Sequence, residues 1–283
     1  MIGFSMNQLY KTIGISKQAV YQYAKRQAVF DHKISSLVVE ADSLRRDFPG
    51  CGVEKMYDIL QPDFIGRDQF VETMMSLGYR LKIKKNYKKT TIASKVYYPN
   101  LIKGMKVDKP STIWQSDITY ILINGKHYYA VFIIDVYTKK IVGYAVSDHM
   151  RATANVKALK MALKQHPPPK IHHSDRGSQY IYKDYISLLE NNGCQISMAL
   201  SAQDNAYAER INRTIKRDYI DRWRIKTFEE LKKKMKKAVD NYNNVRTHNS
   251  IDKKTPVEFE KEFPLMASHQ RKLITIFNNE VLT

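Results

Sequence analysis

The fold of this chain is decided by residues 112–147, TIWQSDITYILINGKHYYAVFIIDVYTKKIVGYAVS. This stretch contains three segments rich in β-branched and aromatic residues, which favour β-strands. Short links join the segments, one through Asn124-Gly125 and one through Thr138-Lys139. Asn-Gly is typical of the tight turn between two antiparallel strands. The stretch therefore predicts three strands that meander through one sheet.

Helices and strands alternate in the residues that follow. We expect a helix over 152–164, stopped by prolines at 167–169, a strand over 170–174, a helix over about 181–192, a strand over 195–199, a long helix from near Asp204 and an amphipathic helix within 231–248. This order predicts the α/β class, with a mixed sheet and helices on its faces. A ribonuclease H-like core has the same order of elements. We place this core, with a C-terminal helical extension, at 108–262, and a tail at 263–283.

The N-terminal region carries a helix-turn-helix pattern. Residues 6–27 predict two short helices with a turn at 13–15, and Ser16 is a suitable N-cap for the second. The second helix of a helix-turn-helix reads DNA. Its candidate DNA contacts here are Lys17, Gln18 and Tyr21. A plain helical hairpin that reads no DNA is the alternative interpretation.

Further helices and a basic linker separate this pattern from the core. We expect helices over 34–49, 53–60 and 67–77, and we interpret 1–79 as a helical DNA-binding region made of small all-α units. Residues 80–107 form a basic linker, in which 80–106 hold nine basic residues and no acid. Tyrosines interleave these charges, which favours a linker that lies along a phosphate backbone over a merely solvated one. Its candidate DNA contacts are Lys84, Lys85 and Lys88.

Charge favours a nucleic-acid partner. The 283 residues include 47 Lys and Arg against 28 Asp and Glu, a formal net charge of +19. A field of this size attracts polyanions. No run of about 18 apolar residues is present, so we expect no membrane span, and the N-terminus lacks the pattern of a signal peptide. Cys51 and Cys194 lie far apart, so we expect reduced thiols rather than a disulfide or a zinc site.

Three acids stand in settings that ordinary folding does not favour. Asp117 interrupts a strand, Asp175 ends one, and Glu209 lies in the first turns of a helix. Converging carboxylates repel one another unless a cation neutralises them, and a set of oxygen ligands without His or Cys suits Mg²⁺ better than Zn²⁺. Two such ions roughly 4 Å apart can promote in-line displacement at a phosphodiester. We therefore predict a site for two Mg²⁺ ions, with Mn²⁺ as a substitute.

Other polar residues near these acids have competing interpretations. Asp204 is expected to cap a helix, Glu190 to sit in a last helical turn, and Asp135 to cap a turn rather than act as a fourth ligand. For His172 and His173 we favour hydrogen-bonded strand histidines over catalytic ones. The candidate DNA contacts around the acids are Arg176, Ser178, Gln179, Tyr180, Asn205, Arg210, Arg213 and Lys216. For Glu209 and Arg213 a simple surface ion pair is the alternative.

Several strings carry a family resemblance. WQSDITYI, VFIIDVYTKKIVGYAVS, HHSDRGSQY, DNAYAERINRTIKRDYI and YNNVRTHNSIDKKTPVEF resemble the integrase core of bacterial insertion-sequence transposases encoded in a second reading frame, which are similar to retroviral integrases. LRRDFPGCGVEKMYDIL resembles the helical unit that precedes this core in those proteins. The resemblance implies a catalytic triad of Asp117, Asp175 and Glu209. It departs in one respect, because the 33 residues between Asp175 and Glu209 are about two fewer than is usual, and the shortening falls in the loop before the helix.

The resemblance also implies an activity and its partners. We expect cleavage at the 3′ ends of the element and strand transfer, through circular intermediates, on double-stranded DNA that includes element ends and target. Synapsis of two ends implies at least a dimer, and the product of an upstream reading frame is a further possible partner. We expect a cytoplasmic, nucleoid-associated bacterial protein. The alternatives are a metal-dependent nuclease on the same core, which cuts without joining, and a non-catalytic DNA-binding regulator.

Overall fold

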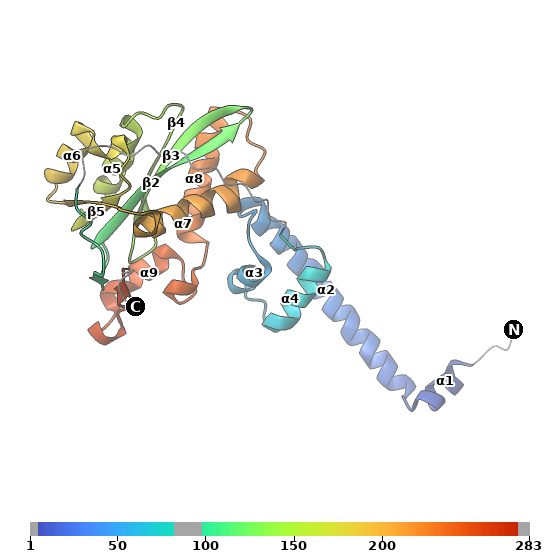
Figure 1. Ribbon diagram of the computed structural model, residues 1–283. Helices are drawn as coiled ribbons and strands as arrows, with labels where there is room; N and C mark the ends of the chain where they lie inside the picture. Colours follow the sequence, from blue (N-terminus) through green and yellow to red (C-terminus); the bar gives the residue numbers. More distant parts are fainter. Residues whose placement is uncertain (1–4, 82–97, 277–283) are drawn as a thin grey trace.

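A five-stranded mixed sheet forms the centre of the molecule (Figure 1). The computed structural model describes residues 5–81 and 98–276. The strands are β2 (Ile113–Ile123), β3 (Lys126–Asp135), β4 (Ile141–Ser147), β5 (Ile171–Ser174) and β6 (Gln195–Met198), in the order β4-β3-β2-β5-β6. β2, β3 and β4 pair antiparallel, whereas β5 pairs parallel with both β2 and β6. The predicted meander and mixed sheet are confirmed. Asn124 and Gly125 both have positive φ, as a tight hairpin turn requires.

Helices cover both faces of the sheet. Their bounds are α5 (Thr153–Gln165), α6 (Lys183–Glu190), α7 (Ala206–Thr214) and α8 (Phe228–Asn244). Because side chains alternate along a strand, β3 serves both faces. Val131 and Ile133 pack in the core beneath α5 and α6, while Ala130, Phe132 and Ile134 pack in the core beneath α7 and α8. The sheet therefore separates two hydrophobic cores.

Shorter elements complete the C-terminal half. They are the 3₁₀ turns η1 (Ser178–Ile181), η2 (Ala202–Asn205), η4 (Ile220–Arg222), η5 (Asn249–Ile251), η6 (Phe263–Leu265) and η7 (Ser268–Gln270), the π-helical turn η3 (Ile215–Tyr219), the helix α9 (Pro256–Glu262), and a two-stranded sheet of β1 (Lys106–Val107) and β7 (Ile274–Thr275). Elements α7, η3 and η4 follow one another directly, so the chain stays helical from Ala206 to Arg222. None of the described helices offers a stretch apolar and long enough to span a bilayer.

The N-terminal region contains one long helix where two shorter ones were expected. Its elements are α1 (Met6–Ile13), α2 (Lys17–Asp47), α3 (Val53–Leu60) and α4 (Arg67–Ser76). The predicted turn is present, with Gly14 in the left-handed conformation and Ser16 accepting a hydrogen bond from the Ala19 amide. The prediction that this helix stops before a separate helix at 34–49 is wrong. Residues 28–33 contain neither Gly nor Pro, so nothing in them ends a helix.

The first part of this region is exposed. Figure 1 shows α1 and the first half of α2 extending away from the rest of the molecule. No residue of α1 is buried, and the buried residues of α2, Leu37 and Ala41, lie in its second half. The second half of α2, with α3 and α4, instead shares a hydrophobic core with α7, η3 and α8. Lys84, Lys85 and Lys88 of the predicted linker lie outside the described residues.

Close contacts hold α2 and α3 against the C-terminal half of the chain, which is the half that carries the sheet. The rings of Phe48 and Tyr219 stack with centroids 5.0 Å apart. The Lys55 ammonium donates a hydrogen bond to the Thr247 carbonyl over 2.8 Å. Gly50 lies so close to η3 that a Cβ atom on it would come within 2.3 Å of the Asp218 Cα. Only glycine therefore permits this approach of the two backbones.

Substitution of Gly50 tests this docking. Gly50→Ala forces the two backbones apart, and we expect a loss of about 1–3 kcal/mol in the free energy of unfolding, measured by urea denaturation. Gly66→Ala is the control, because a Cβ there meets no atom within 4 Å. Gly66 precedes α4 as its N-cap, and its replacement should cost under about 1 kcal/mol. Equal losses in the two variants would contradict the close approach at Gly50.

Candidate active site

The pairing of β2 with β5 brings two aspartates to one position on the sheet. The two strands run parallel, and Ser116 of β2 lies opposite Ser174 of β5. Asp117 and Asp175 are the next residues along each strand direction, so both lie at the same level beside one another. The predicted location of Asp175 directly after a strand is confirmed. The carboxyl ends of parallel strands are a common place for functional groups in α/β proteins.

Asp117 is held on the face of the sheet that α7 covers. Its Oδ1 accepts a hydrogen bond from the Ile118 amide, and its Oδ2 accepts one from Asn212 Nδ2, both over 2.8 Å. The pKa of Asp117 is raised to about 7, first by burial and then by the negative charges of Asp175 and Glu209, against the lowering effect of the two hydrogen bonds. The protonation of Asp117 therefore depends on the charges of the other two acids.

Asp175 and Glu209 complete the acidic group. Asp175 Oδ1 accepts a hydrogen bond from the Gly177 amide over 3.0 Å, yet burial still raises the pKa of Asp175. Burial also raises the pKa of Glu209, the positive charge of Arg213 lowers it, and Asp175 raises it. Glu209 lies in the first turn of α7, which packs against β2 (Figure 1). The two strand-borne acids and the helix-borne acid thus influence one another electrostatically.

Gln115 fixes the start of α7 and hence the position of Glu209. Its Oε1 accepts hydrogen bonds from the amides of Tyr207 and Ala208, over 3.1 and 3.3 Å. Its Nε2 donates to the carbonyl of Asp204 over 3.1 Å. These bonds satisfy amides that the first turn of a helix leaves without partners. Sequence reasoning missed Gln115, although a glutamine two residues before Asp117 in a β-strand was a usable signal.

Two residues expected to contact DNA are interior instead, and the expectation for them is corrected. Asn205 is 2% exposed and donates a hydrogen bond from Nδ2 to the Ser116 carbonyl over 3.0 Å, which adds to the fastening of α7 on β2. Tyr180 is 1% exposed and its hydroxyl lies 3.0 Å from Ser116 Oγ, so its ring packs in the core. A buried aromatic beside a loop gives the same sequence pattern as an exposed one, which explains the error.

The remaining candidate contacts differ in exposure. Arg210, Arg213 and Ser178 are exposed, while Arg176, Gln179 and Lys216 are partly buried. The Gln179 side chain donates a hydrogen bond to the Met150 carbonyl over 3.2 Å. Lys17, Gln18 and Tyr21 are exposed near the start of α2, at the end of the projecting helix that Figure 1 shows far from the sheet.

The competing acids and histidines have structural roles. Asp135 is 3% exposed and accepts hydrogen bonds from the amides of Ser111, Tyr137 and Thr138, which makes it the turn-capping residue that was favoured. Asp204 accepts bonds from the amides of Leu200 and Ser201, and Glu190 is exposed at the end of α6.

The two histidines are buried in β5 and hydrogen-bonded. His172 Nε2 lies 2.9 Å from the Tyr185 hydroxyl, and His173 Nδ1 lies 2.8 Å from Ser197 Oγ. Burial lowers the pKa of His172 to about 3 and that of His173 to about 4. Both imidazoles are therefore neutral at physiological pH, in keeping with the favoured structural role.

The donor chemistry of the acidic group fits a hard divalent cation. All three side chains offer carboxylate oxygens, and the raised pKa of Asp117 reflects, after burial, repulsion that a cation would relieve. Among residues 5–81 and 98–276, no group of three or more His, Cys, Asp and Glu side chains is placed so that it could hold a metal ion, so the three carboxylates would have to draw together around one.

Comparisons with known proteins give the family. The integrase core domain matches residues 107–202, and a second integrase core description matches residues 193–256. A transposase for insertion sequence element IS904 from Lactococcus lactis is 34% identical over 203 residues, which are 70% of this chain and 79% of that protein. The chain belongs to the insertion-sequence transposases. A 31 kDa protein of insertion element IS600 from Shigella sonnei is 32% identical over 212 residues, covering 72% of this chain and 78% of the relative.

The transposase also shares its fold with a chain of a viral intasome. A chain of the simian T-cell lymphotropic virus intasome, solved with a PP2A regulatory subunit, aligns with a TM-score of 0.50 at 14% identity. The alignment covers 59% of the transposase and 60% of that chain. The predicted α/β, ribonuclease H-like catalytic core is confirmed. The enzyme class that follows from the family is polynucleotidyl transferase.

Because the pKa of Asp117 is raised, replacing this acid with a neutral residue should stabilise the folded state, and the gain should depend on pH. A carboxyl with a raised pKa costs the folded state stability as pH rises from about 4 to about 7, because the unfolded chain releases the proton first. In the presence of a chelator, Asp117→Asn should gain ~1–3 kcal/mol relative to the parent between pH 4 and pH 8, measured by thermal melting. The exposed Asp63→Asn serves as control and should show no such trend. A parallel pH dependence of Asp117→Asn and the parent would refute the raised pKa.

Loss of the Gln115 amide should disturb both stability and catalysis. Gln115→Leu leaves two amides of α7 and the Asp204 carbonyl unpaired, so we expect about 2 kcal/mol of destabilisation. Because Glu209 shifts with α7, turnover should fall at least tenfold while affinity for DNA changes little. Gln195→Leu, at an exposed glutamine on β6, is the matched control and should stay within about 0.5 kcal/mol of the parent. Unchanged turnover in Gln115→Leu would show that Gln115 does not position Glu209.

Proposed function

We propose that this transposase cuts and joins DNA at insertion-sequence ends, with Asp117, Asp175 and Glu209 as its catalytic carboxylates. The observation that carries the proposal is the placement of two aspartates side by side on neighbouring parallel strands, electrostatically coupled to a glutamate on α7. A likeness to the transposase for IS904, over most of both chains, supports it.

Divalent cations, two Mg²⁺ ions or Mn²⁺ in their place, would be held by these three carboxylates. When bound, such ions supply activation of the attacking oxygen and stabilisation of the leaving oxygen in phosphoryl transfer. The side chains contribute position and charge. Asn212 holds the Asp117 carboxylate, Gly177 holds that of Asp175, and the Gln115 bonds hold the helix that bears Glu209. Exposed Arg210 and Arg213 offer cations to phosphates beside the reacting one.

The chemistry consists of two displacements at phosphorus. Water attacks the phosphodiester at the element end, its oxygen bonds to phosphorus, and the 3′ oxygen leaves as a hydroxyl. That 3′-hydroxyl then attacks a second phosphodiester, and a new 3′-O–P bond replaces the one that breaks. The number of phosphodiester bonds is unchanged in the second step, so this step needs no external source of energy. Joining the two ends of one element gives a circular intermediate, which later integrates.

The regions of the chain divide this work. In our proposal 1–79 binds element ends, 80–107 follows the DNA backbone as a basic linker, 108–262 carries out the chemistry and 263–283 is a tail. Two ends must be brought together, so the working assembly is at least a dimer on double-stranded DNA, with an upstream reading-frame product as a further partner. The proposed location is the bacterial cytoplasm, at the nucleoid.

An assay with labelled ends tests the proposal. The parent protein, supplied with Mg²⁺, should convert an element end, labelled at the 5′ end of the strand that is cut, into a joined product that requires a free 3′-hydroxyl. Asp175→Asn should lower both cutting and joining by at least a thousandfold while still binding the DNA, because one carboxylate is lost but no positive charge. Asp184→Asn, an exposed carboxylate on α6, is the control and should react normally. Hydrolysis without joining would favour a nuclease, and a fully active Asp175→Asn would refute the site.

A further inference from the structure

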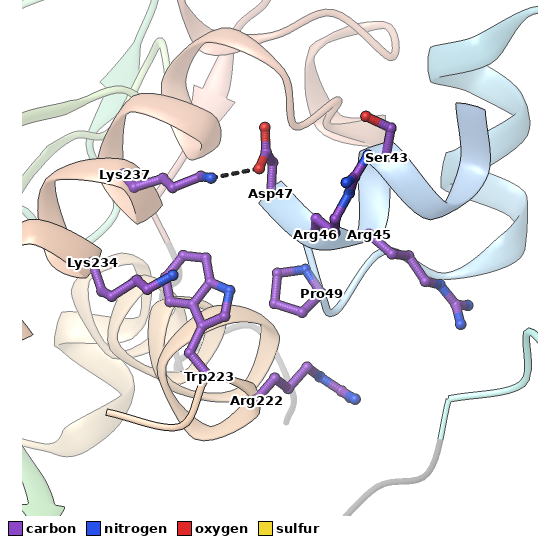
Figure 2. Close-up of a pocket in the computed structure, with 9 residues that line it drawn as sticks. All are labelled: Ser43, Arg45, Arg46, Asp47, Pro49, Arg222, Trp223, Lys234 and Lys237. Carbon is purple, nitrogen blue, oxygen red and sulfur yellow. Dashed lines mark hydrogen bonds and ion pairs between the residues drawn. The ribbon is translucent and has the colours of Figure 1, made fainter. Parts of the chain in front are cut away.

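A basic hollow lies where α2 meets the end of the helical segment that begins with α7. It has a volume of about 640 Å³ and is lined by residues from α2, η4 and α8 and by Pro49 and Trp223, which follow α2 and η4 (Figure 2). Its basic and aromatic members are Arg45, Arg46, Arg222, Trp223, Lys234 and Lys237. These residues are far apart in the sequence, so the hollow exists only because α2 is docked against the catalytic half.

The hollow carries uncompensated positive charge. Of its lining residues five are basic and one, Asp47, is acidic, which leaves +4. Asp47 is engaged by Lys237 over 2.5 Å, as Figure 2 shows. The other four basic residues make no ion pair with an acid in the described part of the chain. Arg45 instead donates hydrogen bonds to the carbonyls of Tyr79 and Cys51. Burial lowers the pKa of Arg45 most, and the positive charge of Arg222 lowers it as well, although Cys51, Tyr79 and Asp42 raise it. Mutual repulsion of this kind is relieved by an anion.

Trp223 gives the hollow a second property that suits a nucleic acid. Its indole Nε1 is buried and has no hydrogen-bond partner within the described residues. The Lys234 ammonium lies 4.8 Å from the centre of its ring. A buried donor without a partner is costly. Basic side chains interleaved with an aromatic ring are typical of surfaces that track a nucleic-acid backbone.

The helical segment links this hollow to the carboxylates. The chain is helical from Glu209 to Arg222, thirteen residues later, and a rise of 1.5 Å per residue makes this about 20 Å. Arg213 and Arg217 are exposed along the way. Successive base pairs of B-DNA are about 3.4 Å apart, so 20 Å corresponds to roughly six base pairs. DNA cut at the carboxylates and lying along this segment reaches the hollow after about half a helical turn.

We infer that the hollow formed by Arg45, Arg46, Arg222, Trp223, Lys234 and Lys237 binds the phosphate backbone of the element end about six base pairs from the cut. This inference rests on the proposed function, since it takes the carboxylates as the point of cutting. It assigns the junction between α2 and the catalytic half a direct role in holding DNA. A terminal sequence gripped at both points is fixed in register relative to the cut.

Binding measurements without divalent metal test the inference. Arg222→Ala/Lys234→Ala should bind a 20-base-pair element end roughly tenfold more weakly than the parent at 0.1 M salt and lower the salt slope by about 2. Lys233→Ala is the matched control, an exposed lysine next to Lys234 but outside the hollow, and should lower the slope by less than about 1. Thermal melting checks that each variant is folded.

Single neutral methylphosphonates locate the contact. In the parent, one placed about six base pairs from the cut should weaken binding, and in Arg222→Ala/Lys234→Ala the same substitution should have no further effect. An interference pattern that is identical in parent and variant would overturn the inference, as would affinity of the variant equal to that of Lys233→Ala. Either result leaves the proposed function standing if Asp175→Asn fails to join DNA. Joining by Asp175→Asn would instead remove the proposed function, whatever the binding data.

Discussion

Parallel pairing between β2 and β5 is the interaction on which the site depends. It sets Ser116 against Ser174, and the next residue of each strand is an acid. Two carboxylates at one level of a sheet repel each other, so the pairing works against its own charges. Apolar cores on both faces of the sheet supply the free energy that offsets this repulsion. The raised pKa of Asp117, which is caused first by burial, shows that ionising this carboxyl is unfavourable in the folded state without a nearby cation.

The third acid is placed by polar contacts rather than by the sheet. Gln115 and Asn205 connect β2 with the start of α7 through four hydrogen bonds, three by Gln115 and one by Asn205. Both side chains are buried, so each bond would be expensive to break. This fastening holds the helix that bears Glu209 on β2, so the position of Glu209 does not depend on the loop before α7.

Local patterns predicted most of the core and its acids, whereas long-range contacts escaped prediction. Asn124-Gly125 predicted the hairpin because this pair is typical of tight turns. Asp117 and Asp175 could be singled out because acids are rare in strands. Tyr180 and Asn205 were misjudged, since burial depends on elements distant in sequence. The length of α2 was missed because a predicted boundary had no helix-breaking residue to support it. The hollow around Trp223 was invisible for the same physical reason, as its two sides are separated by more than 170 residues.

The π-helical turn at Ile215–Tyr219 interrupts the helical segment that joins Glu209 to the contact with α2. A π-turn holds one residue more than an α-helical turn. Deleting that residue would convert the turn to regular α-helix and leave the downstream end in nearly its present orientation relative to Glu209. Removing a residue from the regular part, between Glu209 and Thr214, would instead rotate Tyr219 by about 100° about the helix axis and take it out of its stack with Phe48. The aromatic contact between the two halves of the molecule therefore fixes the length of the regular part of this segment.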